Sequence, residues 1–302
     1  MKKISERLFL LLLVLLFNAS AQDPQAYQLS VNVDLVVLNA TVRDQKGRVA
    51  SDLREQDFEI FEDGVKQAIR LFRHEDIPVA VGLVIDHSGS MRAKLASVTA
   101  AARTFIQSSS PDDQIFVVNF NENVTLGLPA AIPFTNSPDD LAKAIAGTPA
   151  TGQTALYDAV WKAREWLAGG SRDKKVLIVI SDGGDNASTH TVADILRTGD
   201  RLNVQVYTIG IFDPDDPDKN PGILRQMAKA TGGESFVPGE LSEVVAVCES
   251  IAKDIRSQYT LGYLSSAATQ TGGYHSIRVQ ARGTGKAKLR VRTRSGYSSG
   301  GR

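Results

Sequence analysis

The segment Val81–Met91, VGLVIDHSGSM, joins a hydrophobic run to a cluster of oxygen-bearing side chains. Continuous hydrophobic residues of this kind are typical of a strand that is buried on both faces of a parallel sheet. The run ends at Asp86, and hydroxyls follow at every second position, in Ser88 and Ser90. A carboxylate and two hydroxyls directly after a buried strand indicate a ligand site at the carboxyl end of that strand.

Strands and helices alternate on the C-terminal side of this segment. Hydrophobic spacing predicts which residues form each element. Helices are predicted over 91–107, 137–146 (capped by Asn136 or Ser137), 155–167, 189–202, 222–230 and 241–256, and strands over 79–85, 114–120, 175–181, 204–211 and 234–237. This alternation predicts an α/β fold with a doubly wound, mostly parallel sheet and helices on both of its faces.

The flanks of this region have a period of two, which is typical of strands. Residues 27–43 alternate like one strand, and 57–74 predict two strands joined by a turn at 62–64. Three more strands are predicted over 259–264, 275–282 and 287–294. Each flank, at roughly 50 residues, is too short to form a core alone. We expect both to pack together as an antiparallel β-sandwich, with two independent flaps as the alternative.

The N-terminus predicts export. Lys2, Lys3 and Arg7 precede the hydrophobic run Leu8–Phe17, and a short segment of small residues ends at Ala21. These features are typical of a secretory signal peptide cleaved after Ala21. The alternative is an uncleaved anchor, but the run is shorter than the ~20 residues that span a membrane. We expect a secreted or periplasmic, cell-envelope protein with no transmembrane span once the signal is removed.

The predicted domain organisation has five parts. They are a signal peptide over 1–21, an N-terminal β-rich segment over 22–76, the α/β domain over 77–256, C-terminal strands over 257–297 that pack with the N-terminal segment, and a flexible tail over 298–302. The formal charge is zero, so no basic excess points to nucleic acid. The single cysteine, Cys248, lies in a hydrophobic helical pattern and is predicted to be buried rather than reactive.

Two further residues are expected to join the cluster after the first strand. Asp182 follows the hydrophobic strand 176–181, and Thr154 stands before a predicted helix in a loop where Gly152 permits close approach. Carboxyl ends of parallel strands meet at one edge of the sheet, so these oxygens should lie together. Asp86, Ser88, Ser90, Thr154 and Asp182 form an all-oxygen set that suits Mg²⁺, with Mn²⁺ or Ca²⁺ as alternatives, rather than Zn²⁺.

The charge of this set predicts the kind of partner. Hydroxyls are neutral ligands, and if one carboxylate binds directly while the other acts through water, the ion stays electron-deficient. Such an ion favours an anionic ligand, so we expect a protein partner to complete the coordination with an Asp or Glu carboxylate. Neighbouring helix N-termini add to this preference.

Three motifs carry a family resemblance. DHSGSM (86–91), GQTALYDA (152–159) and ISDGGDN (180–186) together resemble the von Willebrand factor type A domain over about 77–256. That family's metal-ion-dependent adhesion site uses D-x-S-x-S, a Thr and an Asp, and its pattern maps onto Asp86, Ser88, Ser90, Thr154 and Asp182. The flanks look like those of bacterial exported proteins built around this domain. The resemblance implies a magnesium-binding adhesion module.

Simpler roles exist for some of these residues and their neighbours. The serines or Thr154 could cap the helices that follow them. We expect His87 to be a solvated loop residue rather than a pH-sensitive part of the site. We expect Asp185 and Asn186 to lie in solvated loop, with a position around the metal ligands as the alternative. The acidic segment Phe212–Gly222 is expected to be a specificity loop or a plain turn, with a second cation site as the alternative.

Catalysis is not expected. Asp86, His87 and Ser88 are the residue types of a hydrolase triad, but adjacent side chains diverge, and no G-x-S-x-G turn or phosphate-binding loop is present. The sequence therefore predicts an exported, divalent-metal-dependent protein-binding module and not an enzyme. The alternatives are a cell-envelope scaffold or assembly factor whose metal is structural, and a Mg²⁺-dependent hydrolase.

Overall fold

A computed structural model describes residues 35–196, 203–213, 217–266, 273–283 and 289–299. The predicted signal peptide, its cleavage site after Ala21 and the first part of the predicted strand 27–43 lie outside this part of the chain. Within it, no helix is long and hydrophobic enough to cross a membrane.

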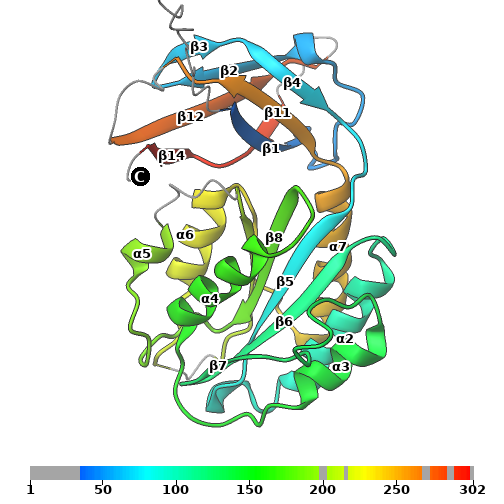
Figure 1. Cartoon of the computed structure of the whole chain (residues 1–302), viewed down its shortest axis with the longest axis vertical. Helices are drawn as coiled ribbons and strands as arrows, with labels where there is room; N and C mark the ends of the chain where they lie inside the picture. Colours follow the sequence, from blue (N-terminus) through cyan, green and yellow to red (C-terminus); the bar gives the residue numbers. More distant parts are fainter. Residues whose placement is uncertain (1–34, 197–202, 214–216, 267–272, 284–288, 300–302) are drawn as a thin grey trace, which may run out of the picture. The chain divides into compact units, whose positions relative to one another are not determined.

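The α/β region is built on a six-stranded sheet with the order β10-β9-β8-β5-β6-β7 (Figure 1). Its strands are β5 (Val79–Asp86), β6 (Gln114–Phe120), β7 (Val124–Leu126), β8 (Lys174–Ser181), β9 (Gln205–Gly210) and β10 (Ser235–Phe236). All neighbours are parallel except β6 and β7. Every residue of β5 and β8 is buried, which explains their unbroken hydrophobic sequences. The predicted fold class is confirmed, and the short edge strand β7 is an addition.

Helices cover both faces of this sheet. They are α2 (Leu95–Gln107), α3 (Pro138–Ala146), α4 (Leu156–Ala168), α5 (Val192–Leu196), α6 (Pro221–Thr231) and α7 (Val244–Arg256), with 3₁₀ turns η2 (Gly89–Met91) and η3 (Leu241–Glu243). One group contains α2, α3 and α7, and the other contains α4, α5 and α6 (Figure 1). The Ser137 hydroxyl caps α3 by accepting from Asp140 N at 3.3 Å, as predicted. Cys248 is buried in the core, as expected.

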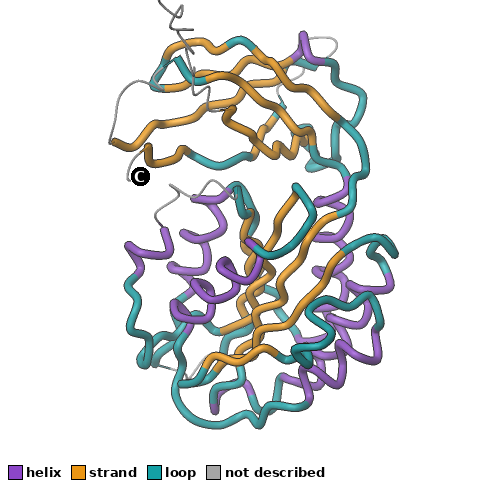
Figure 2. The backbone as a smooth tube through the Cα atoms, in the orientation of Figure 1, coloured by secondary structure: helices purple, strands orange, loops and turns teal. Residues whose placement is uncertain are grey.

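The flanks form two four-stranded antiparallel sheets, shown as strands in Figure 2. One has the order β13-β1-β11-β4 and the other β14-β12-β2-β3. The strands are β1 (Leu35–Arg43), β2 (Phe58–Glu62), β3 (Val65–Gln67), β4 (Ile69–Arg73), β11 (Tyr259–Leu264), β12 (Gly273–Ala281), β13 (Arg290–Arg292) and β14 (Gly296–Ser299); the 3₁₀ turn η1 (Glu55–Asp57) precedes β2.

The two flanks share one hydrophobic core. Leu38 pairs with Leu261 between β1 and β11, and Ile60 pairs with Val279 between β2 and β12. Each pair joins a residue from the N-terminal flank to one from the C-terminal flank, and all four are buried. The predicted sandwich is therefore confirmed, and the alternative of two independent flaps is wrong.

Two details of the sandwich differ from the prediction. The second strand expected within 57–74 is divided at Ala68, because β3 pairs with β2 while β4 pairs with β11 in the other sheet. Strands that change sheet in this way form the corners of sandwiches, and periodicity alone does not reveal the change. The predicted tail over 298–302 also starts inside β14, which ends at Ser299. The domain boundaries otherwise stay predictions.

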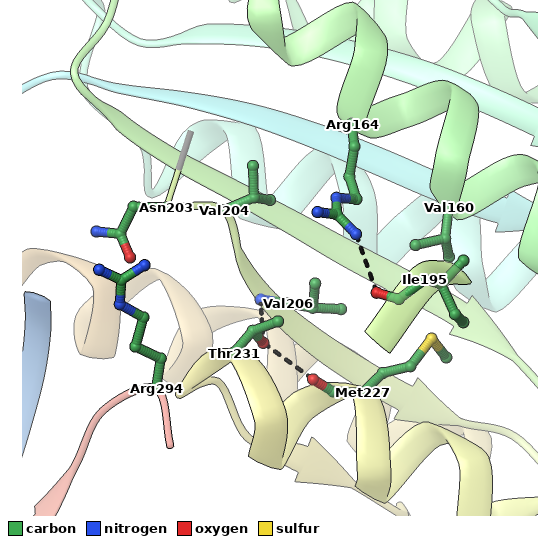
Figure 3. Close-up of a pocket in the computed structure, with 9 residues that line it drawn as sticks. All are labelled: Val160, Arg164, Ile195, Asn203, Val204, Val206, Met227, Thr231 and Arg294. Carbon is green, nitrogen blue, oxygen red and sulfur yellow. Dashed lines mark hydrogen bonds between the residues drawn. The ribbon is translucent and has the colours of Figure 1, made fainter. Parts of the chain in front are cut away.

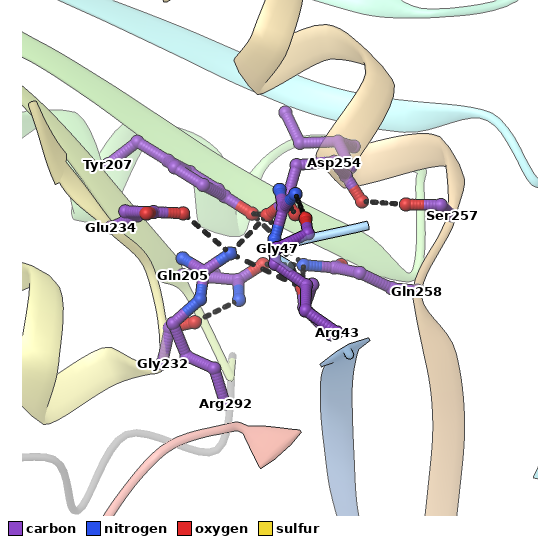
Figure 4. Close-up of polar contacts among 12 residues, drawn as sticks. Arg43, Gly47, Gln205, Tyr207, Gly232, Glu234, Asp254, Ser257, Gln258 and Arg292 are labelled. Atoms are coloured by element: carbon purple, nitrogen blue, oxygen red, sulfur yellow. Dashed lines mark hydrogen bonds and ion pairs between the residues drawn. The ribbon is translucent and has the colours of Figure 1, made fainter. Parts of the chain in front are cut away.

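A buried polar cluster connects α7 to strands of the sandwich (Figure 4). The Asp254 carboxylate, on α7, is 1% exposed. It accepts hydrogen bonds from Tyr207 Oη at 2.5 Å, Arg43 Nη2 at 2.8 Å and Thr41 Oγ1 at 3.3 Å, and it pairs with Arg292. Two guanidinium groups compensate the buried charge, which would otherwise carry a large desolvation cost.

Candidate metal site

The site begins at the last residue of β5. Asp86 is fully buried, and its Oδ1 accepts from Ser88 N at 2.8 Å while its Oδ2 accepts from Ser181 Oγ at 2.6 Å. Burial raises the pKa of Asp86 to about 6, and the hydrogen bonds from Ser181 and Ser88 oppose this shift. Both carboxylate oxygens therefore already have a donor from the chain itself.

The two serines and the second aspartate continue from Asp86 as a hydrogen-bonded row. Ser88 Oγ lies 3.1 Å from Ser90 Oγ, and Ser90 Oγ donates to Asp182 Oδ2 at 2.5 Å. Asp182 directly follows β8, the neighbour of β5, and its Oδ1 accepts from Gly184 N at 3.1 Å. Four of the five predicted residues are thus brought together from two adjacent strand ends. Ser90 is exposed, whereas the other three are buried.

The hydroxyls do not serve as helix caps. Ser88 precedes η2 but makes no capping hydrogen bond with its side chain, and α2 starts only after Lys94. The residue at the N-cap of α4 is Ala155, so Thr154 lies one position too early to cap that helix. The capping alternative is therefore wrong for these three hydroxyls, which leaves them available for other contacts.

Thr154 reaches the same region through the loop that follows β8. Its backbone N donates to Asn186 Oδ1 at 2.9 Å, and Asn186 N donates back to Thr154 O at 2.9 Å. Asp185 accepts from Tyr157 N at 2.9 Å, which holds the same loop against the first turn of α4. The sequence predicted that Asp185 and Asn186 lie in solvated loop. In the structure they instead join the loop of Asp182 to that of Thr154.

The burial of His87 also differs from the prediction. This residue is fully buried rather than solvated, with Nδ1 3.0 Å from Thr148 O and Nε2 3.1 Å from Asn119 Oδ1. Successive side chains of an extended segment point in opposite directions, so His87 turns away from the cluster of Asp86 and Ser88. Burial lowers the pKa of His87. The histidine therefore braces the loop after β5 from the protein interior.

Glu122, at the tip between β6 and β7, also borders this region, and no sequence pattern indicated it. Its Oε2 accepts from Gln153 N at 3.0 Å and occupies the space in which a Cβ on Gly152 would lie. Gly152 has φ +84°, and its carbonyl accepts from Gly89 N at 3.3 Å. The close approach that Gly152 was expected to permit is made by this carboxylate, which only tertiary structure brings to the Thr154 loop.

The donor set of the site is restricted to oxygen. No group of three or more His, Cys, Asp or Glu residues is placed to hold a metal ion anywhere in the described part of the chain. Any cation bound by Asp86 and Asp182 would therefore depend on hydroxyl and water ligands in addition to carboxylates. Such a set fits a hard cation such as Mg²⁺ better than Zn²⁺, which prefers nitrogen and sulfur.

A partly open pocket lies elsewhere, lined by residues of α4, α5, α6 and β9 (Figure 3). Its volume of about 20 Å³ is enough for a single water molecule. Val160, Met227 and Arg294 are among the residues that line it, and Arg164 Nη1 donates across its edge to Ile195 O at 2.9 Å. This cavity is too small to be an alternative ligand site.

Comparisons with known proteins agree with this architecture. Residues 81–184 match the family model of the von Willebrand factor type A domain. A solved von Willebrand factor type A structure from Catenulispora acidiphila is 17% identical, with a TM-score of 0.51, and the match covers 86% of this chain and 72% of that one.

A second solved relative is proximal thread matrix protein 1 from the mussel byssus. It is 19% identical with a TM-score of 0.50, and the match covers 61% of this chain and 49% of that one, about half of the mussel protein's length. The same mussel protein with a zinc-occupied MIDAS motif is 20% identical, with a TM-score of 0.50 and coverages of 61% and 49%. A comparison with curated proteins gave no match.

Proposed function

We propose that the chain is a divalent-metal-dependent protein-binding module, because residues 81–184 match the family model of the von Willebrand factor type A domain. The cation in this proposal is Mg²⁺ by preference. It is held by Asp86, Ser88, Ser90, Thr154 and Asp182. The observation that carries the proposal is the row of hydrogen-bonded oxygens from Asp86 through the two serines to Asp182. We also propose that the chain is a secreted or periplasmic, cell-envelope protein, because its N-terminal sequence predicts a signal peptide.

The contacts within the site suggest how the ligands divide their roles. We propose that Asp86, whose two oxygens accept from Ser181 and Ser88, acts on the ion through water. A serine hydroxyl can donate its proton to a carboxylate and still offer a lone pair to a cation. Ser90 can therefore keep its hydrogen bond to Asp182 while it binds the ion. The bound cation supplies a positive charge that attracts an anionic group.

The exposed side of the site determines where a partner would bind. Ser90 is the exposed member of the row, whereas Asp86, Ser88 and Asp182 are buried. The exposed Ser90 thus marks a side from which a partner can reach the ion. We propose that the partner is a protein whose Asp or Glu carboxylate completes the coordination at this position.

The zinc-occupied mussel relative supports a divalent cation in this type of domain. For this chain the all-oxygen donor set favours Mg²⁺, or Mn²⁺, over zinc. An interaction module also agrees better with the site than a hydrolase does, because His87 is turned into the interior and cannot act as a base on a ligand bound near Ser90.

The proposal is tested by titrating Mg²⁺ into the metal-free chain by calorimetry and by capturing partners from the source envelope with Mg²⁺ or EDTA. We expect wild type to bind one Mg²⁺ and to capture a partner only with Mg²⁺, and Asp182→Ala to do neither. The control is Glu165→Gln. Glu165 is an exposed residue of α4 that lies about three helical turns beyond Thr154. EDTA that unfolds the domain would instead favour the scaffold with a structural metal.

A further inference from the structure

Helix α4 begins next to the proposed ligand Thr154, but the residue at its N-cap position cannot cap it. That residue is Ala155, whose side chain has no hydrogen-bond acceptor. The first backbone N–H groups of a helix have no partner within the helix itself. An oxygen-bearing side chain at the N-cap normally accepts from one of them. The start of α4 therefore depends on acceptors from another part of the chain.

The segment 185–188, in the loop that follows β8, supplies these acceptors from outside the helix. Asp185 Oδ2 accepts from Tyr157 N at 2.9 Å, and Ser188 Oγ accepts from Asp158 N at 3.1 Å. Ser188 Oγ in turn donates to Asp185 Oδ2 at 2.6 Å. The segment thus caps two successive N–H groups in the first turn of α4.

Asn186, from the same segment, extends this cap to Thr154. Its Oδ1 accepts from Thr154 N at 2.9 Å. The backbone N–H groups of Asn186 and Ala187 both donate to Thr154 O, at 2.9 Å and 3.1 Å. Asn186 lies only four positions after Asp182 in the sequence. Two of the proposed metal ligands, Thr154 and Asp182, therefore lie on chain segments that are hydrogen-bonded to each other.

Thr154 depends on this support more than the other proposed ligands do. Those four residues are joined in one row of hydrogen bonds, which contains Asp86, Ser88, Ser90 and Asp182. Within the part of the chain that the structure describes, the Thr154 hydroxyl makes no hydrogen bond to any of them. The backbone contacts with Asn186 and Ala187 thus connect Thr154 to the loop of Asp182.

We infer that Asn186 is a positioning residue for the metal site, because it holds Thr154 in place before the cation binds. This inference rests on the proposed function and adds a residue that acts through one of its ligands. A ligand that is already held in place loses less conformational entropy when the ion binds. Asn186 is exposed whereas Thr154 is buried, so a change at Asn186 alters this support without removing a core side chain.

The test compares Asn186→Ala, which lacks the side-chain acceptor, with Asn186→Asp, which keeps one. In EDTA, the Thr154 amide should exchange with solvent roughly tenfold faster in Asn186→Ala than in wild type, because its hydrogen bond is lost. Calorimetry should show a roughly fivefold weaker Mg²⁺ affinity in Asn186→Ala, as expected for one hydrogen bond. Asn186→Asp should retain the wild-type exchange rate and an equal or higher Mg²⁺ affinity.

The matched control is Asn136→Ala. Asn136 is also an exposed asparagine with a side-chain hydrogen bond to the backbone, from its Nδ2 to Pro111 O at 2.8 Å. Pro111 precedes β6, so this contact lies at the amino ends of the strands, opposite the proposed site. Asn136→Ala should change neither the Thr154 exchange rate nor the Mg²⁺ affinity. Urea unfolding in EDTA verifies that every variant is folded.

A double-mutant cycle with Thr154→Val separates positioning from a direct effect of Asn186 on the ion. If Asn186 acts through Thr154, Asn186→Ala should not weaken Mg²⁺ binding further once the Thr154 hydroxyl is absent. Additive effects on Mg²⁺ affinity, or wild-type affinity and Thr154 exchange in Asn186→Ala, would overturn this inference and leave the proposed function intact. If wild type binds no Mg²⁺, the proposed function fails, and this inference fails with it.

Discussion

Ser90 Oγ donates a hydrogen bond to Asp182 Oδ2 at 2.5 Å, although the two residues are 92 positions apart in the sequence. The contact exists because β5 and β8 are adjacent parallel strands and the two residues lie just beyond their carboxyl ends. It brings a hydroxyl of the D-x-S-x-S motif to the second aspartate. The proposal that separate motifs form one metal site depends on this contact.

Replacing Asp182 by Asn should weaken Mg²⁺ binding at least tenfold, which corresponds to about 1.4 kcal/mol. The change removes one of two negative charges at the site but keeps a side chain of the same shape beside Ser90. Calorimetric titration of the metal-free protein measures the effect, with Glu165→Gln as the control. Unchanged Mg²⁺ affinity in Asp182→Asn would show that the ion binds elsewhere.

The stability of the metal-free protein should depend on the charge of Asp86. Its pKa of about 6 in the folded protein lies above the ordinary 3.8, so the folded state holds this proton more tightly than the unfolded state does. The contribution of Asp86 to the free energy of unfolding is therefore largest below about pH 4 and decreases as the pH rises to about 6.

In EDTA at pH 7.5, Asp86→Asn should accordingly be more stable than wild type, by up to about 3 kcal/mol, and this difference should shrink towards pH 4. Urea unfolding at both pH values provides the measurement. Burial also lowers the pKa of His87, but this residue is present in both proteins. If Asp86→Asn is less stable than wild type at pH 7.5, burial does not destabilise the charged form of Asp86 as we expect.

Replacing His87 by Ala should destabilise the domain by about 1–3 kcal/mol, because it leaves a cavity and removes partners from Thr148 O and Asn119 Oδ1. Urea unfolding in EDTA separates this loss from any effect of metal. His190→Ala is a suitable control, since His190 is partly exposed on the loop before α5. Equal stability of wild type and His87→Ala would mean that this histidine is solvated after all.

Gly152→Ala should lower the free energy of unfolding by about 1 kcal/mol, because an L-residue is strained at φ +84°. Glu122 can rotate away from the new methyl group, so the double variant with Glu122→Ala should not regain this stability. Full recovery in the double variant would show that crowding by Glu122, and not the backbone conformation, sets the cost.

Asp254→Ala should destabilise the protein by about 3–5 kcal/mol, since it leaves the charges of Arg43 and Arg292 without their buried partner. Asp139→Asn, which removes an exposed ion pair with Arg103, should change stability by less than about 1 kcal/mol. Chemical denaturation of the three proteins at pH 7.5 compares these effects. Similar values for both variants would contradict the role of Asp254 in holding α7 to the sandwich strands.

The sequence was most informative where one local pattern determines the structure. The hydrophobic runs before Asp86 and Asp182 predicted the central strands, and the loop positions after them brought both aspartates to one edge of the sheet. Period-two segments in both flanks predicted the shared sandwich, because neither could bury its hydrophobic face alone.

Other features depend on contacts between distant residues, which local patterns do not encode. The burial of His87 results from Asn119 and the loop at Thr148, and the approach of Glu122 to Gly152 results from the hairpin of β6 and β7. Ser181, which donates to Asp86, was predicted only as a strand residue. The change of sheet at Ala68 is likewise invisible in a pattern that records only alternation.

The most direct test of the metal site is a crystal of the chain soaked in Mn²⁺ and measured for anomalous scattering. We expect one anomalous peak bounded by the oxygens of Ser88, Ser90, Thr154 and Asp182, which disappears when excess Mg²⁺ competes. Absence of a peak among these side chains at saturating Mn²⁺, or a peak bound only by other residues, would contradict it.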